Sequence, residues 1–512
     1  MLSLLAFRNL LHKPWRSALL FLGYGMGVTV MIVLLSIGEA LITQARDEKL
    51  VGGGEVTVLP EGLDIEVMKT GGLGGLFFSI DNARFVYLQL LASPRLAGDV
   101  RAVAPQIEGK LLYLTTPDGR EVTVRASGEV PSATRAVGAA PLLAAGAWED
   151  DEGDRRWTRP TPAELRHDVD HFHLPPPGLA NPRSWAEWHY FNVLSPDRRR
   201  WAFVSFILAG EIPEGRWGGQ VLVTTHEQGA GERGRPPRRY SALAPPSEIR
   251  FSTRDADLRL GEAGSVTVLP DGRYAVRARV REETTGAPLD LDLVVAPAPR
   301  AYFPGASLRS GDFASGYAVA ALRAEASGTI CAGSRAAAGP AARRCERFDR
   351  AQAYHDHNWG TWRGVSWEWG ATRAGAYTLL FGRVQPPDSL DTSSPLFVYL
   401  VDSLGFRTLF RPRTIAYEDG RVVRVGGREI RVPSRGLLYD VRGRDTLRLE
   451  ITVEDAAGTD TRGDLIERGE SDYARALARP YFIQMKGTAR LSGRVEGAPI
   501  AGEGAGFFET YR

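Results

Sequence analysis

The residues from Tyr354 to Gly360, Tyr-His-Asp-His-Asn-Trp-Gly, concentrate side chains that could carry proton chemistry. Within seven positions they combine a carboxylic acid, two imidazoles, an amide and an indole. Three more tryptophans follow at Trp362, Trp367 and Trp369, so a large aromatic surface adjoins the polar residues. A carboxylic acid in an apolar cavity keeps its proton to higher pH because desolvation disfavours the anion, and aromatic faces stabilise a developing cation. The motif therefore indicates acid chemistry in an enclosed apolar site.

We predict Asp356 as the acid, with His355 or His357 setting its protonation state or positioning a water molecule. Such a site could add water across an isolated alkene or cyclise a polyene, because both reactions need a strong proton donor and a shielded carbocation. Two alternatives stay open. The motif could be a buried hydrogen-bonded knot in which Asp356 accepts from backbone amides, or it could bind a ligand without turnover.

β-Strands must position this motif, because most of the sequence has the composition of an all-β protein. The chain contains 57 glycines and 32 prolines among 512 residues, and helical apolar periodicity is scarce after the first fifty positions. Strand-like runs cover 201–208, 274–280, 289–295, 446–453 and 488–495. Many short strands separated by turns are typical of β-barrels or sandwiches, and about 330 residues suffice for two of them.

A second motif, Glu187-Trp188-His189-Tyr190-Phe191, and the terminal run from Gly504 to Glu509 complete a recognisable pattern. Together with Tyr354 to Gly360 they resemble the hydroxyneurosporene synthase (carotenoid 1,2-hydratase) and AttH-like family, over about residues 165–512. The resemblance implies two lipocalin-like β-barrels side by side and acid-catalysed hydration, cyclisation or isomerisation of a hydrophobic polyene or isoprenoid-type ligand. His189 stands where the family usually has a second tryptophan, which leaves the substrate open. The expected pocket residues are Tyr354, Trp359, Glu187, Trp188, His189 and Tyr190.

The N-terminal region contains one segment that could cross a membrane. No charged residue occurs from Ser17 to Gly38, and 22 helical residues span about 33 Å, the thickness of a hydrocarbon core. Arg8, Lys13 and Arg16 precede the segment, so we expect a cytoplasmic N-terminus and an extracytoplasmic, periplasmic bulk of the chain. A cleaved signal peptide is the alternative; the apolar segment is long for one, and no clear cleavage site follows.

The first 150 residues resemble the start of macrolide-exporter-type and lipoprotein-release-type ABC transporter permeases. The resemblance rests on the amphipathic stretch up to Arg16, the run from Gly52 to Pro60, and Ala102 to Ile107. Such permeases carry further membrane helices near their C-terminus, and this sequence shows none. The resemblance implies ABC ATPase and permease subunits as partners. It also implies two rivals to catalysis, a subunit that binds lipophilic cargo or a structural accessory subunit of the exporter.

Composition changes suggest where the domains divide. An acidic and proline-rich stretch between Trp148 and Pro177 is the clearest boundary, and Pro117-Asp118-Gly119 between two strand-like runs predicts a hairpin before it. We expect a membrane anchor at 1–45, a small extracytoplasmic α/β domain at 46–150, a linker at 151–180, and lipocalin-like barrels at 181–385 and 386–512. In the linker, His167, His171 and His173 suit zinc in residue type, but their spacing is a weak signal, so we predict no metal site.

The sequence lacks the features that are typical of several other function classes. A net charge of +2 argues against nucleic-acid binding. No phosphate loop and no Gly-x-Ser-x-Gly motif occurs, so we expect neither ATP hydrolysis nor a serine hydrolase, and no cofactor. Cys331 and Cys345 are the only cysteines. Outside the cytoplasm a disulfide between them would contribute roughly 3 kcal/mol; two free thiols are the alternative.

Overall fold

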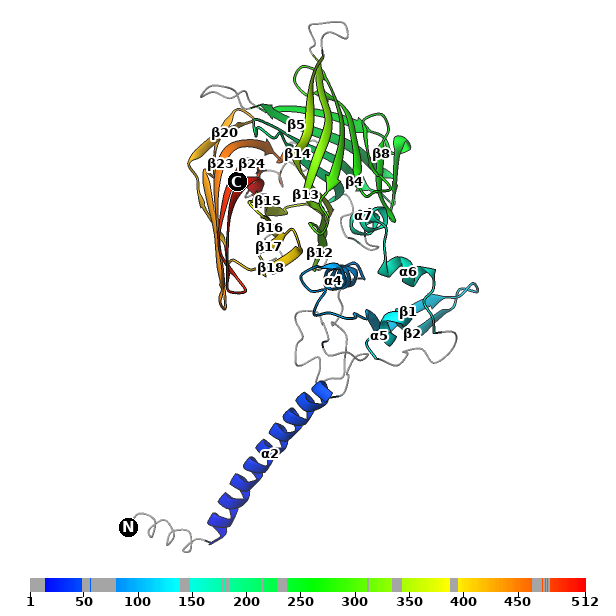
Figure 1. Cartoon of the computed structure of the whole chain (residues 1–512), viewed down its shortest axis with the longest axis vertical. Helices are drawn as coiled ribbons and strands as arrows, with labels where there is room; N and C mark the ends of the chain where they lie inside the picture. The colour runs from blue at the N-terminus through cyan, green and yellow to red at the C-terminus, as the bar shows by residue number, and fades with distance from the viewer. Residues whose placement is uncertain are drawn as a thin grey trace, which may run out of the picture. The chain divides into compact units, whose positions relative to one another are not determined.

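The computed structural model describes residues 14–47, 80–138, 148–175, 184–212, 215–227, 237–310, 313–333, 343–386, 395–462 and 479–512, with a few single positions between them. The chain forms two compact units (Figure 1). The first comprises residues 1–78 and 100–154, and the second comprises residues 79–99 and 155–512.

The first unit contains the apolar helix α2 (Pro14–Asp47). Its part from Pro14 to Ile37 has 24 residues and a mean hydropathy of 2.3, and is long and apolar enough to cross a membrane, as a signal sequence also can be. The predicted hairpin is present: β1 (Gln106–Thr115) pairs antiparallel with β2 (Glu121–Glu129), and α5 (Pro131–Ala136) follows. The permease-like residues before Pro14, and those from Gly52 to Pro60 except Val56, lie outside the described residues.

The second unit begins with short helices and a closed barrel. The helices are α4 (Ile80–Ala92), α6 (Glu152–Thr158), which starts in the first unit, and α7 (Pro162–Asp170). Among the described residues, eight antiparallel strands close the barrel in the order β11-β13-β14-β3-β4-β5-β6-β10, because β10 also pairs with β11. Their bounds are β3 (Trp185–Leu194), β4 (Arg200–Glu211), β5 (Arg216–Glu227), β6 (Arg238–Ala244), β10 (Tyr274–Glu282), β11 (Pro288–Pro297), β13 (Phe313–Gly333) and β14 (Arg343–Thr361).

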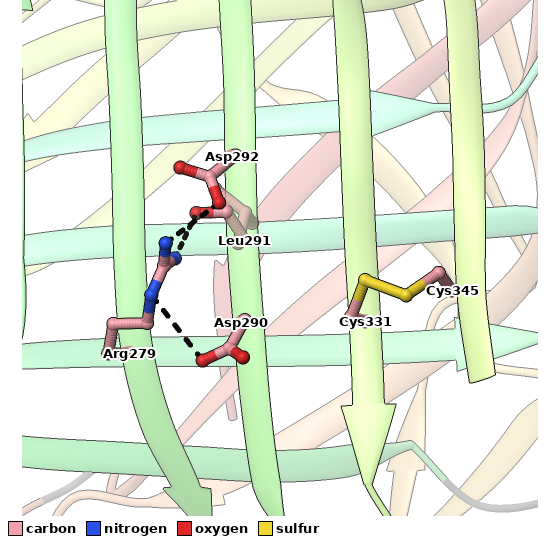
Figure 2. The surroundings of a disulfide bond; sticks show 6 residues. All are labelled: Arg279, Asp290, Leu291, Asp292, Cys331 and Cys345. Carbon is pink, nitrogen blue, oxygen red and sulfur yellow. Dashed lines mark hydrogen bonds and ion pairs between the residues drawn. A yellow bond between two sulfur atoms is a disulfide. The ribbon is translucent and has the colours of Figure 1, made fainter. Parts of the chain in front are cut away.

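Smaller elements extend this barrel. The strands β7 (Ile249–Ser252), β8 (Asp255–Leu260) and β9 (Gly264–Val268) continue the sheet from β10, η2 (Pro246–Glu248) precedes them, and β12 (Phe303–Ser310) pairs with β13. A disulfide bond joins Cys331 and Cys345, which lie opposite each other on β13 and β14 (Figure 2). It links two strands that already share backbone hydrogen bonds.

The second sheet is a curled half-barrel beside the first barrel (Figure 1). Its nine described strands follow the order β18-β17-β16-β15-β25-β24-β23-β22-β19, and a hairpin of β20 (Arg421–Val425) and β21 (Arg428–Val432) packs on β23. The bounds are β15 (Ser366–Ala374), β16 (Tyr377–Gln385), β17 (Phe397–Asp402), β18 (Gly405–Phe410), β19 (Ile415–Glu418), β22 (Arg435–Arg442), β23 (Asp445–Asp460), β24 (Tyr481–Val495) and β25 (Ala498–Tyr511). The predicted fold class, mainly β with two lipocalin-like barrels side by side after an apolar helix, is confirmed, with the second barrel present as the curled half-barrel.

Three apolar clusters follow from strand alternation, which sends successive side chains to opposite faces of a sheet. One cluster fills the barrel and includes Phe191, Phe206 and Tyr274. A second fills the curled sheet. The third lies between the two sheets and includes Trp369 and Tyr354. The wall of the barrel therefore has an inner face toward its own core and an outer face toward the curled sheet.

Candidate functional site

The Tyr354 to Gly360 motif lies in β14, and alternation divides it between the two faces of the barrel wall. His355 and His357 point inward; the His355 ring stacks on Phe191 at a centroid distance of 4.0 Å. Tyr354 and Asp356 point outward, where the Tyr354 hydroxyl donates to Asp356 Oδ2 at 2.6 Å. Asp356 and its two neighbouring imidazoles therefore point to opposite faces of the wall, because residues adjacent in a strand face opposite sides.

The inner imidazoles converge on Asp170, which ends α7. Asp170 Oδ2 lies 2.8 Å from Nε2 of His355, and its Oδ1 lies 2.9 Å from Nδ1 of His357. Nδ1 of His189, on β3, is 3.4 Å from the same Oδ1. Each of these four side chains is fully buried. A capping box at Thr161 and Glu164 starts α7 and so fixes where its last residue enters the barrel.

A second inner carboxylate, Glu187, extends the network along β3. Glu187 accepts the backbone N–H of His173 at 2.8 and 2.9 Å. Its Oε1 lies 3.0 Å from Nδ1 of His173 and 2.9 Å from Nε2 of His357. The His173 ring stacks on Trp359 with centroids 3.7 Å apart. We call the six residues the inner cluster: Asp170, His173, Glu187, His189, His355 and His357.

Two overlapping sets within the inner cluster bring three ligand atoms within 4.8 Å of one another, as a metal ion requires. The first set is Asp170, His189 and His357, and the second is His173, Glu187 and His357. Of the three linker histidines considered from the sequence, only His173 belongs to either set. His167 Nδ1 accepts the N–H of Ala256, and His171 Nδ1 lies 2.9 Å from the carbonyl oxygen of Asp168.

The inner cluster holds its carboxylates in the charged form. Desolvation raises the pKa of Asp170, but the imidazoles of His355 and His189 outweigh it and hold that pKa well below its usual value. Likewise His173 and His357 overcome desolvation and lower the pKa of Glu187. Desolvation lowers the pKa of His357, yet Asp170 and Glu187 together raise it to about 10. The result is a buried set of ion pairs in which His357 lies between two anions.

On the outer face, Asp356 has different neighbours. It accepts from the Tyr354 hydroxyl and, at 2.7 Å, from Nδ2 of Asn358, while Trp369 donates to the Tyr354 hydroxyl at 2.8 Å. Desolvation raises the pKa of Asp356 to about 8 despite these hydrogen bonds, and the charge of Glu509 on β25 raises it further. These five residues form the interface cluster. Asp356 thus carries a proton at neutral pH between the two sheets.

Glu509 presents a second carboxyl group to this region from the curled sheet. Trp367 donates to its Oε2 at 2.9 Å, and burial raises the pKa of Glu509. Trp367 also lies in a group of indoles, with centroids 6.2 Å from Trp188 and 5.6 Å from Trp362. Two carboxyl groups with raised pKa values therefore lie beside an aromatic surface that both sheets supply.

A cavity of ≈ 410 Å³ opens next to Trp367. Its aromatic lining comes from Trp367, Tyr417 and Tyr511, and its charged lining includes Arg383 and Arg512. Volumes of a few hundred cubic ångströms are typical of small-molecule sites. The cavity thus places a ligand-sized space one side chain away from Glu509.

The structure divides the predicted site residues between two places. The inner face holds Glu187, His189, His355, His357 and Trp359; the outer face holds Tyr354, Asp356, Trp188 and Tyr190. Sequence reasoning missed Asp170 and Glu509 as site residues. Asp170 lies in the linker between His167 and His171, and Glu509 ends the terminal glycine-rich run. Their proximity to β14 was the missing information.

Comparison with solved structures finds proteins that this chain resembles at low sequence identity and low TM-score. A putative AttH protein from Nitrosomonas europaea is 16% identical with a TM-score of 0.43, over 67% of this chain and 100% of that one. Kievitone hydratase from Nectria haematococca is 11% identical with a TM-score of 0.39, over 67% of this chain and 96% of that one. CghA with Sch210972 is 13% identical with a TM-score of 0.37, over 69% and 96%. No protein-family model matches the sequence, and no curated protein matches it.

Proposed function

We propose that this protein is a lipocalin-like enzyme that acts on a hydrophobic polyene or isoprenoid-type ligand by acid-catalysed hydration, cyclisation or isomerisation. The observation that carries the proposal is the interface cluster: Asp356 is buried to 3% exposure, is bonded by two neutral donors, and lies among aromatic rings from both sheets. A carboxylic acid in such surroundings keeps its proton at neutral pH and can donate it to a substrate.

In the proposed hydration, Asp356 donates its proton to one alkene carbon. The cation that forms on the other carbon lies beside indole faces, whose quadrupole stabilises it. The Asp356 carboxylate left behind keeps its hydrogen bonds from Tyr354 and Asn358. Water then adds to the cation, and the proton that the water loses returns to Asp356, so the acid is regenerated. Loss of a neighbouring proton instead of addition of water gives isomerisation, and attack by a second alkene gives cyclisation.

A non-catalytic role is the second candidate, supported by the ≈ 410 Å³ cavity and the 24-residue apolar segment of α2. On this proposal the chain is anchored in the cytoplasmic membrane with its bulk outside the cytoplasm. It would receive a lipophilic cargo for an ABC exporter, with ATPase and permease subunits as partners. The cavity would then bind the cargo, and the carboxyl groups would need no turnover.

The experiment begins with the full chain purified in detergent, from which bound small molecules are extracted and identified by mass spectrometry. Turnover of the identified ligand is then compared between wild type, Asp356→Asn and Asp349→Asn. Asp349 is the matched control because it lies on the same strand but is exposed. We expect Asp356→Asn to lower kcat at least about 100-fold with ligand binding retained, and Asp349→Asn to leave it unchanged. Equal turnover in both variants would remove the acid assignment, and retained ligand without any wild-type turnover would favour cargo binding.

A further inference from the structure

The inner cluster contains a buried nitrogen that lacks a hydrogen bond. Nδ1 of His357 lies 2.9 Å from Oδ1 and 3.0 Å from the backbone carbonyl of Asp170, so this nitrogen carries the ring hydrogen. The other nitrogen, Nε2, has no hydrogen-bond partner among the described residues, although Glu187 Oε1 is 2.9 Å away. Once Nε2 loses its proton, it aims a lone pair toward Glu187 Oε1. A cation between these two atoms would stabilise the arrangement.

His173 completes a set of donors around the same point. Its Nδ1 lies 3.0 Å from Glu187 Oε1, Nε2 of His357 lies 2.9 Å from the same oxygen, and the three residues bring ligand atoms within 4.8 Å of one another. Two imidazole nitrogens and one glutamate oxygen are a donor set that zinc uses in proteins, with a further position left for water. The backbone N–H of His173, which donates to both oxygens of Glu187, holds the carboxylate in place.

We propose that His173, Glu187 and His357 bind one divalent transition-metal ion of the zinc class inside the first barrel. The ion replaces the proton that otherwise lies between His357 Nε2 and Glu187 Oε1, so each binding event releases one proton. Asp170 acts as the outer partner that accepts from Nδ1 of His357 and orients its ring. Because ligands of tetrahedral zinc lie about 3.4 Å apart, the two imidazole nitrogens each move a few tenths of an ångström away from Glu187 Oε1 on binding.

The other set, Asp170, His189 and His357, is less suited to this role. Nδ1 of His357 already bonds Asp170, and each side chain of this set is fully buried. In the proposed site the His173 side chain is 27% exposed, whereas that of Glu187 is 1% exposed. An ion can therefore reach the site on the side of His173, whose ring Trp359 holds by stacking.

The test uses the full chain, stripped with a chelator and titrated with Zn²⁺ by calorimetry, with bound metal counted after dialysis. We expect one zinc per chain in wild type, and an affinity at least about tenfold weaker in His173→Gln and in Glu187→Gln. His171→Gln is the matched control, since it removes an imidazole two residues away that belongs to neither donor set. Substitution of Co²⁺ adds a visible absorption band that should be lost in His173→Gln and kept in His171→Gln.

Two controls keep the result decisive. Far-UV circular dichroism checks that each variant is folded, and His173→Gln remains the deciding variant if Glu187→Gln does not fold, because His173 is partly exposed. Asp356→Asn, on the opposite face of the wall, should bind zinc like wild type, which separates this site from the proposed catalytic one. Wild type that binds no zinc, or binds it no more tightly than a folded His173→Gln, would overturn the proposal.

Discussion

The two faces of the barrel wall treat buried carboxyl groups in opposite ways. Asp170 and Glu187 on the inner face and Asp356 on the outer face are all 3% exposed or less. Yet the pKa values of the two inner groups are lowered, while the pKa of Asp356 is raised to about 8. Imidazoles surround the inner carboxylates, whereas Asp356 bonds a phenol and an amide and lies near the carboxyl group of Glu509. The type of neighbour rather than the depth of burial therefore decides which carboxyl group is charged.

The largest expected difference between the faces is in stability. Asp170→Asn leaves His355 and His357 without the anion that both contact, and we expect it to lower the free energy of unfolding by roughly 3–5 kcal/mol. Asp356→Asn replaces a neutral acid by an amide that still accepts from Tyr354, so about 1 kcal/mol or less should be lost at pH 7. Urea unfolding followed by tryptophan fluorescence measures both. Equal losses would mean that Asp356 is also an ion-pair partner.

Glu509, which approaches the outer face of the wall from β25, should make stability fall as the pH rises. The pKa of Glu509 is raised on folding above its usual 4.5, so its stabilising protonation is complete below that value and is lost as the pH rises through the folded-state pKa. Wild type should lose stability relative to Glu509→Gln as the pH rises above 4.5, with a slope of at most about 1.4 kcal/mol per pH unit. Parallel unfolding free energies of the two proteins from pH 4.5 to pH 9 would contradict this.

The smallest effect should come from charges that face solvent on the same barrel. Arg279 on β10 lies 2.8 Å from Asp292 and 3.5 Å from Asp290 on β11, and its side chain is 44% exposed (Figure 2). Arg279→Gln should cost less than about 1 kcal/mol, and less still in high salt, because water already screens the pairs. If Arg279→Gln lowers the free energy of unfolding as much as Asp170→Asn does, solvent exposure does not explain the difference between the Arg279 pairs and the buried Asp170 pairs.

Much of the fold could be predicted from local pattern, because strand alternation and turn residues are local properties. The hairpin around Pro117-Asp118-Gly119 and the strand-like runs at 201–208 and 274–280 are examples. Whether a sheet closes is not a local property. The barrel closes through the pairing of β10 with β11, while in the described part of the chain the end strands β18 and β19 of the curled sheet do not pair. The rhythm of strands alone therefore could not distinguish the barrel from the half-barrel.

The candidate site was predictable only in part. The Tyr354 to Gly360 motif lies on the strand that carries residues of both clusters. The alternation of side chains along a strand predicts from sequence alone that Asp356 faces away from His355 and His357. The partners could not be found in this way. Asp170 is 185 residues from His355 along the chain, and Glu509 reaches the interface from the last strand of the other sheet. Only tertiary packing assigns each carboxyl group its neighbours.

The most direct test of the contrast between the faces is the infrared absorption of protonated carboxyl groups at pH 6, compared between wild type, Asp356→Asn and Asp349→Asn. Exposed carboxylates are ionised at this pH, whereas Asp356, with a pKa of about 8, keeps its proton. We expect the carbonyl band of protonated acid to lose intensity in Asp356→Asn and to remain unchanged in Asp349→Asn. A band of equal intensity in all three proteins would contradict a neutral Asp356 and, with it, the acid at the centre of the proposed chemistry.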